Sequence, residues 1–146
     1  MDVENSNFLR FVASAEKHGV EYILIGGLAL LFNGIVRFTQ DADAWLQPTN
    51  ENRDRFMNVL LDLEYGESDL EALRAADFTE PQIIRISEGP IYVLTRDGYT
   101  SVYSMMIVGN GPNYGRARGH KAYFLHINDL RETKVLARKI RMMCYE

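Results

Sequence analysis

A chain of 146 residues, 47% of them hydrophobic, is expected to fold as a single domain, residues 1–146, around a core of its own. Its net charge of −4 argues against a broad nucleic-acid interface, while a local basic patch stays compatible with it. No apolar run approaches the ~20 residues of a membrane span, residues 1–11 lack the pattern of a secretion signal, and Cys144 is the single cysteine, so we expect a cytoplasmic protein.

The beginning of the chain predicts a helix, a strand and the start of a second helix. Apolar residues at helical spacing predict a helix from Ser6, which can cap it, to Lys17, with Gly19 ending it. The apolar, β-branched run 20–25 predicts a strand that stops at Gly26-Gly27. Because glycine has no side chain, it permits a sharp turn and a close approach of a ligand to the backbone. A helix is expected to begin at this turn.

The next elements are predicted to be helices on either side of a second strand. Residues 28–32 are good helix formers, and Asn33-Gly34 ends that helix. A strand is expected at residues 42–47, and Pro48-Thr49-Asn50 then starts a longer helix. The buried stripe predicted for this helix is Phe56, Val59, Leu60 and Leu63. Residues 69–76 are expected to form another short helix.

The second half predicts strands joined by tight turns. The expected strands are residues 82–87, 91–95, 101–108 and 121–127, the first three as an antiparallel meander. Asn128 is expected to cap a last helix that runs to about Met142. The predicted fold class is therefore α/β (α+β), with a single mixed, largely antiparallel sheet and helices packed on it.

Two basic features lie in this half. The glycine-rich stretch Gly109–Gly119 is predicted to be a loop that carries Arg116 and Arg118. On the last helix, four cations at spacings of three, four and three form one stripe: Arg131, Lys134, Arg138 and Arg141. Both features fit a role beside a substrate cleft, and both also fit a solvated surface. The scattered His18, His120 and His126 are expected to be structural.

The segment from Tyr22 to Leu46 combines two devices for binding a charged ligand. The free amide groups of the helix that begins at Gly26-Gly27 offer an anion site. Asp41 and Asp43 are two residues apart, so both carboxylates point to one face of an extended chain, where their like charges favour a divalent cation. The alternative is a plain strand–turn–helix with two solvated acids.

This arrangement resembles the nucleotidyltransferase superfamily, which includes the β-type DNA polymerases, the aminoglycoside adenylyltransferases and the minimal nucleotidyltransferases of toxin–antitoxin systems. In those families a Gly-Gly or Gly-Ser turn opens a helix, and an Asp-x-Asp follows on the next strand. Residues 37–43 are similar to the branch with an Arg-x-(Ser/Thr)-x-Asp-x-Asp signature, which includes abortive-infection toxins. Lys134 and Arg138 resemble a later helix of that branch, although Arg141 stands where an Asp is usual.

The resemblance implies a nucleotidyltransferase-like fold that transfers a nucleoside monophosphate from a nucleoside triphosphate to an acceptor hydroxyl. Asp41 and Asp43 would hold Mg²⁺ or Mn²⁺. The residues that would bind the nucleotide are Gly26, Gly27, Arg37, Thr39 and Lys134. The acceptor is a protein, a transfer RNA or a small molecule, and a partner protein or a homodimer would supply the acceptor-binding surface that a short chain lacks.

Active members of the superfamily also use a third carboxylate on a later strand, and this sequence is deficient there. The position is expected within residues 100–105, which contain no acid. Asp97 in the preceding turn is the nearest candidate catalytic acid, and Glu88 is farther off. The alternative to an active enzyme is therefore a catalytically degenerate nucleotide-binding or toxin–antitoxin interaction module, and a third reading is an α/β protein with no nucleotide role. Arg37 also fits a surface ion pair, and Thr39 an ordinary strand residue.

Overall fold

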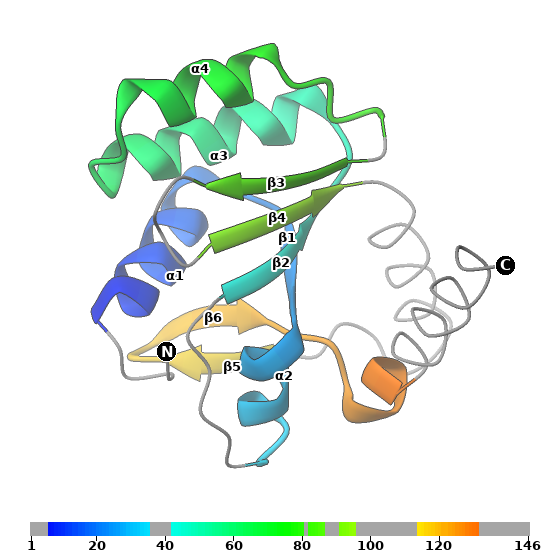
Figure 1. Cartoon of the computed structure of the whole chain (residues 1–146). Helices are drawn as coiled ribbons and strands as arrows, with labels where there is room; N and C mark the ends of the chain where they lie inside the picture. The colour runs from blue at the N-terminus through cyan, green and yellow to red at the C-terminus, as the bar shows by residue number, and fades with distance from the viewer. Residues whose placement is uncertain (1–5, 36–41, 81, 87–90, 96–113, 132–146) are drawn as a thin grey trace, which may run out of the picture.

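The computed structural model describes residues 6–35, 42–80, 82–86, 91–95 and 114–131, which form a mixed set of helices and strands (Figure 1). The helices are α1 (Ser6–His18), α2 (Gly26–Phe32), α3 (Asn50–Asp62) and α4 (Glu67–Ala75). The strands are β1 (Tyr22–Ile25), β2 (Ala42–Leu46), β3 (Gln82–Ile86), β4 (Ile91–Thr95), β5 (Tyr114–Ala117) and β6 (His120–Tyr123). Within the described ranges, no helix is both long enough and apolar enough to pass through a bilayer.

Four strands form the main sheet in the order β1-β2-β4-β3. The β1–β2 and β3–β4 pairs are antiparallel, and the central β2–β4 pair is parallel, with Ala42 opposite Ile91. Parallel strands need a long crossover, which here contains α3, α4 and β3. The expected mixed, largely antiparallel arrangement of helices and strands is therefore confirmed for this sheet.

The strands β5 and β6 pair with each other in a second sheet, so the described strands form two sheets and not the single one expected. One isolated parallel bridge joins Leu24 of β1 to Phe124, the residue that follows β6. The Leu125 amide also donates a hydrogen bond to the Leu24 carbonyl, at 3.0 Å. The second sheet is thus attached to the outer edge of β1 by the chain that leaves it.

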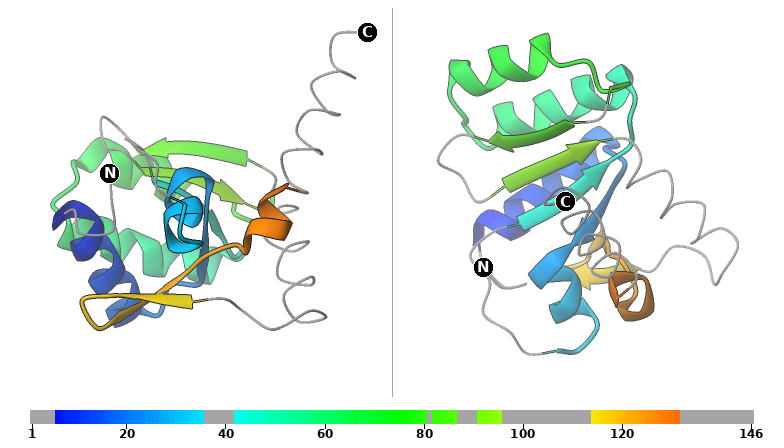
Figure 2. Two further views of the ribbon diagram at one scale, coloured as in Figure 1. Left: turned by 90° about the horizontal axis from the view of Figure 1, so that it is seen from below. Right: turned by 45° about the vertical axis from the view of Figure 1, so that its right-hand side comes forward.

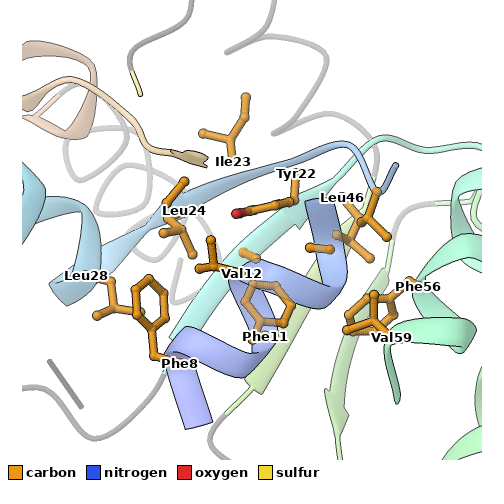
Figure 3. Packing of buried hydrophobic residues seen from close by; sticks show 14 of the residues in the cluster. Phe8, Phe11, Val12, Tyr22, Ile23, Leu24, Leu28, Leu46, Phe56 and Val59 are labelled. Atoms are coloured by element: carbon orange, nitrogen blue, oxygen red, sulfur yellow. The ribbon is translucent and has the colours of Figure 1, made fainter. Parts of the chain in front are cut away.

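The helices α1 and α3 lie on one face of the main sheet and bury apolar side chains against it (Figures 1 and 2). The apolar residues predicted on the first helix are all buried: Phe8, Phe11, Val12 and Ala15. In α3 the predicted stripe is confirmed for Phe56, Val59 and Leu60, while Leu63 is partly buried. Figure 3 shows the labelled side chains of the two helices beside Tyr22, Leu24 and Leu46 of the first two strands; they are Phe8, Phe11, Val12, Phe56 and Val59. Each fully buried Leu, Val or Phe side chain contributes about 1.5–3 kcal/mol to folding.

A buried amide fixes α3 against the first two strands. Asn52 is 1% exposed, and its side chain accepts a hydrogen bond from the Glu21 amide (2.9 Å) and donates to the Glu21 carbonyl (2.8 Å). Its Nδ2 also donates to the Gln47 carbonyl, at 3.2 Å. The side chain therefore pairs with the backbone as a neighbouring strand would, just before β1 and just after β2. The Thr49 hydroxyl caps the same helix by accepting a hydrogen bond from the backbone amide of Asn52, at 3.1 Å.

The predicted loop at Gly109–Gly119 is wrong for residues 114–119, which form β5 and a tight turn; residues 109–113 lie outside the described part of the chain. The turn consists of Arg118 and Gly119, both with positive φ (46° and 86°), between the paired residues Ala117 and His120. Two positive φ values match the twist of a two-residue β-hairpin. An arginine in place of the usual Asn or Asp at the first turn position concealed this hairpin from the sequence.

The expected last strand and helix are placed differently from the prediction. The strand ends at Tyr123, and a short helical segment begins at Ile127, so Asn128 lies inside the helix and does not cap it. His126 takes the capping position, because its ring Nδ1 lies 3.2 Å from the Asn128 amide nitrogen and its carbonyl accepts from the Leu130 amide. The predicted strand at 101–108 and the helix beyond Arg131 lie outside the described residues.

The Asn52 contacts lead to a first prediction. Replacing Asn52 by Ala leaves the Glu21 amide and carbonyl without their partner in a buried place, so the free energy of unfolding should fall by about 2–4 kcal/mol. Urea denaturation measures this change in the free energy of unfolding. The matched control is Asn58→Ala on the exposed face of the same helix, which should change stability by less than about 0.5 kcal/mol. Equal losses from both variants would mean that the buried amide adds nothing beyond helix propensity.

Candidate functional site

The glycine turn and the Asp-x-Asp strand are neighbours because β1 and β2 form an antiparallel pair. In this register Ile25, the last residue of β1, is opposite Asp43. The helix α2 begins at Gly26, directly after β1. The structure therefore brings Gly26, Gly27 and Asp43 into one place, as the sequence predicts.

Gly26 is required by its conformation and by its neighbour. Its φ is 64°, in the left-handed region that residues with a Cβ rarely adopt. A Cβ on Gly26 would also lie 2.8 Å from Oδ2 of Asp43, closer than an ordinary van der Waals contact. The Asp43 carboxylate therefore lies directly against the Gly26 backbone.

The alternation of β2 places Asp43 on the face away from the main helices. Ala44 and Leu46 are buried in the core that α1 and α3 cover, whereas Asp43 and Trp45 are partly exposed. Asp43 thus lies at the end of the glycine turn, on a partly exposed face of the sheet.

The other predicted site residues cannot be located in the same way. Five of them lie outside the described residues: Arg37, Thr39, Asp41, Asp97 and Lys134. Asp41 is the residue immediately before β2, so covalent geometry keeps its Cα within about 7 Å of the Cα of Asp43. The contacts of these five residues stay a prediction.

The structure identifies a strand beside Asp43. The neighbour of β2 is β4, where Tyr92 is opposite Asp43. Residues 100–105, where the third carboxylate is expected, lie outside the described part of the chain. Asp43 is the only acidic residue in the four described strands of the main sheet. The β4 strand ends at Thr95, opposite Leu46, about 10 Å along the sheet from the level of Asp43. Thr95, the last described residue before Asp97, therefore lies at the end of β4 remote from Asp43.

Asn33 holds the far end of α2, a role that the sequence did not reveal. Its Nδ2 donates to the Ala29 carbonyl (2.7 Å) and to the Leu125 carbonyl (2.9 Å), and its Oδ1 accepts from the Ile127 amide at 3.1 Å. The Asn33-Gly34 dipeptide indicated the helix end, but its cross-chain partners follow only from the fold. Through Asn33 the position of α2, and with it the glycine turn, is tied to the segment after β6.

The chemistry available at the glycine turn within the described residues is that of a single carboxylate beside a glycine backbone. No three His, Cys, Asp or Glu side chains of these residues gather closely enough to hold a metal ion. Carboxylate oxygens are nevertheless the ligands that Mg²⁺ and Mn²⁺ prefer, and Mg²⁺ usually keeps several waters and uses only one or two carboxylates. Asp43 with Asp41 has the composition of such a site.

Other titratable groups have structural partners. His18 Nε2 is 2.7 Å from Oδ2 of Asp62, and His120 Nδ1 is 2.9 Å from Oε2 of Glu16. With the capping role of His126, the histidines are structural, as expected. These contacts help to hold the pKa values of Asp62 and Glu16 below their usual range; for Asp62 the hydrogen bond from Ser14 contributes most.

Tyr22 lies on the core side of β1 and is not a catalytic candidate. Its hydroxyl is buried and has no hydrogen-bond partner among the described residues. Burial raises the pKa of this hydroxyl, and the nearby Tyr123 and Glu16 raise it further. Tyr22 therefore stays protonated and neutral at physiological pH.

The contact between Gly26 and Asp43 gives a second prediction. Gly26→Ala should lower the free energy of unfolding by about 2–4 kcal/mol, because it combines the cost of positive φ with a steric overlap. Gly34→Ala is the matched control: its φ is 85°, but no atom lies within 4 Å of the added Cβ, so only the conformational cost of about 1–2 kcal/mol remains.

A double-mutant cycle then isolates the overlap. Combining Gly26→Ala with Asp43→Ala should recover at least about 1 kcal/mol, because the smaller side chain removes the clashing oxygen. Chemical denaturation of the four proteins measures the coupling. Additive losses would show that the Asp43 carboxylate does not lie against Gly26 in solution.

Comparison of the chain with protein-family models, with curated proteins and with solved structures found no match. The interpretation of the site at the β1–α2 turn therefore depends on its residues and their geometry.

Proposed function

We propose that this chain is a nucleotidyltransferase-like domain that binds a nucleoside triphosphate together with Mg²⁺ or Mn²⁺ where β1, α2 and β2 meet. The observation that carries the proposal is the contact of the Asp43 carboxylate with the backbone of Gly26. A turn without side chains and a carboxylate beside it are the two parts that a metal–triphosphate ligand requires: room at the backbone for phosphate, and an oxygen donor for the cation.

The glycine turn supports phosphate binding mainly through access. α2 has only seven residues, so its dipole contributes little. Gly26 and Gly27 instead remove the side chains that would keep a phosphate away from the backbone amides. Under this proposal Arg37 and Lys134 neutralise the phosphates, and Thr39 supports the carboxylates.

Asp41 and Asp43 would hold the divalent cation, whose chemistry is to neutralise the triphosphate and lower the pKa of the attacking hydroxyl. The two side chains alternate with Ala42, so on an extended chain they face the same side. The transfer itself would move a nucleoside monophosphate to an acceptor, which is a protein, a transfer RNA or a small molecule, and would release pyrophosphate. A partner protein or a second copy would complete the acceptor side.

A second function is favoured by the scarcity of acids in the main sheet. Its four described strands hold Asp43 and no other carboxylate, and β4, the neighbour of β2, has Tyr92 opposite Asp43. Two-metal transfer needs carboxylates on both sides of the reacting groups. A nucleotide-binding module without transferase activity, of the kind found in toxin–antitoxin pairs, is therefore the alternative, and it shares the same triphosphate site.

The third prediction tests the triphosphate site. With Mg²⁺ and the preferred nucleoside triphosphate at 100 times its dissociation constant, the protein should gain about 2.7 kcal/mol of apparent stability, seen as a rise in melting temperature. Asp43→Asn should lose the Mg²⁺-dependent part of this rise, while the ligand-free protein keeps its stability. The control Glu71→Gln, an exposed acid on α4, should retain the full rise.

Scanning the four nucleoside triphosphates with Mg²⁺ and with Mn²⁺ covers the ligand choices. If none raises the melting temperature of the unmodified protein, the proposed function is wrong. An undiminished rise in Asp43→Asn would place the nucleotide elsewhere on the molecule.

The fourth prediction separates enzyme from binding module. If the protein transfers a labelled nucleotide, Asp97→Asn should retain transfer, because Thr95, the last residue of β4, is opposite Leu46 and about 10 Å along the sheet from the level of Asp43. Glu88→Gln is the comparison variant. Glu88 precedes β4 in the sequence, and the first residue of β4, Ile91, is opposite Ala42, next to Asp43. Loss of transfer in Asp97→Asn with intact triphosphate binding would restore Asp97 as the third acid. No transfer by the unmodified protein, with binding intact, would identify a binding module.

A further inference from the structure

The β5–β6 hairpin has one face packed on the core and one face turned outward. Alternation puts three small residues on the inner face: Gly115, Ala117 and Ala122. The paired residues that alternate with these form what we call the hairpin outer face: Tyr114, Arg116, Lys121 and Tyr123. Figures 1 and 2 show the hairpin at the periphery of the molecule, away from α3 and α4.

Close packing against the core explains why the residues of the inner face are small. A Cβ on Gly115 would lie 2.5 Å from the ring of Phe32, which stacks on Phe124 with ring centroids 5.2 Å apart. Ala117 and Ala122 are both buried. These small residues allow the hairpin to lie on the aromatic rings of the core. On the outer face Tyr114 and Arg116 are exposed, and Lys121 and Tyr123 are partly buried.

Folding stability explains only some residues of the hairpin outer face: the Tyr123 ring packs edge-on against the buried Tyr22 ring, with centroids 6.3 Å apart. Arg116 is directly opposite Lys121, and like charges in this position destabilise a strand pair. Tyr114 is 52% exposed, with the Lys121 ammonium 4.9 Å from its ring centroid and the Tyr123 ring 6.4 Å away. An exposed aromatic ring thus stands beside two cations, on a chain whose net charge is −4.

Glu16 of α1 lies close to these cations and reduces their field. It pairs with His120 at 2.9 Å, and its charge also interacts with Arg116. Arg116 itself donates to the Gly119 carbonyl at 2.9 Å, which orients its guanidinium toward the turn. Among these described residues, the two cations of the outer face, Arg116 and Lys121, outnumber this one acid.

We propose that the hairpin outer face binds single-stranded nucleic acid. Arg116 and Lys121 would contact backbone phosphates, and the exposed Tyr114 ring would stack on a base. A base must be free of a partner strand to reach a tyrosine ring on a flat strand face, so the occupant is a single strand and not a duplex. The hairpin outer face consists of four residues, two from each strand, so it contacts few nucleotides. This proposal stands on the hairpin alone and is independent of the triphosphate site.

The test is fluorescence anisotropy with a labelled oligo-uridine RNA and an oligo-thymidine DNA, each about 12 nucleotides long, at several salt concentrations. Tyr114→Ala should weaken binding by about 5- to 100-fold, whereas Tyr114→Phe, which keeps the aromatic ring, should bind within about 2-fold of the unmodified protein. Arg116→Ala and Lys121→Ala should each reduce the slope of log affinity against log salt by about 0.7.

Two controls make the result specific to this face. Glu16→Gln should strengthen binding, because it removes a negative charge that interacts with Arg116. Arg74→Ala, an exposed cation on α4, should leave affinity and salt slope unchanged. All of these side chains except Lys121 and Tyr123 are exposed, so circular dichroism should show an intact fold in each variant.

Four outcomes with the unmodified protein and Tyr114→Ala would overturn the proposal. They are no binding of either oligonucleotide at low salt, equal affinity of Tyr114→Ala and the unmodified protein, tighter binding of a duplex of the same sequence, or equally strong binding to vesicles of anionic phospholipid. The last result would indicate an electrostatic surface without base stacking. Retention of oligonucleotide binding in Asp43→Asn would keep this face separate from the triphosphate site, and loss there would also contradict the proposal.

Discussion

The antiparallel pairing of β1 with β2 is the constraint on which the rest of the structure depends. Its register sets Ile25 against Asp43, so the glycine turn at the end of β1 and the carboxylate of β2 occupy one place. The same pair presents Tyr22, Leu24 and Leu46 to α1 and α3, and β2 offers its other edge to β4. A shift of one residue would turn Asp43 into the core and Ala44 outward, so the buried face and the candidate site are fixed together.

Two side-chain amides fix the positions of elements outside the main sheet. Asn52 joins α3 to the start of β1 and the end of β2, and Asn33 joins the end of α2 to the segment after β6. Both replace missing strand or helix partners with an amide that donates and accepts at once. The glycine turn is therefore held from both sides: by the sheet where α2 begins and by Asn33 where α2 ends. A phosphate-sized ligand would meet a backbone that is already in place, which lowers the entropic cost of binding.

Local patterns in the sequence were sufficient for α1, α2, α3 and α4, because apolar spacing, caps and glycine ends act within a few residues. They were also sufficient to group Gly26 with Asp43. They could not reveal that β2 pairs in parallel with β4, or that Tyr92 is the residue beside Asp43, because strand partners are chosen by packing between distant segments. The hairpin at Arg118–Gly119 was missed for a different reason, since positive φ at an arginine is enforced by the strands around it and has no strong local signal.

The parallel pairing of β2 with β4 also shapes how the chain reaches its fold. Residue 42 must find residue 91, so closing this pair is entropically more demanding than closing the neighbouring antiparallel pairs, and it is expected to form late. During synthesis, α1, β1, α2, β2 and α3 leave the ribosome before β4 exists. In that interval the edge of β2 that will receive β4 lacks its strand, and an open strand edge is a template for association between chains. The nascent protein is therefore most vulnerable to aggregation in the time between the synthesis of β2 and the arrival of β4.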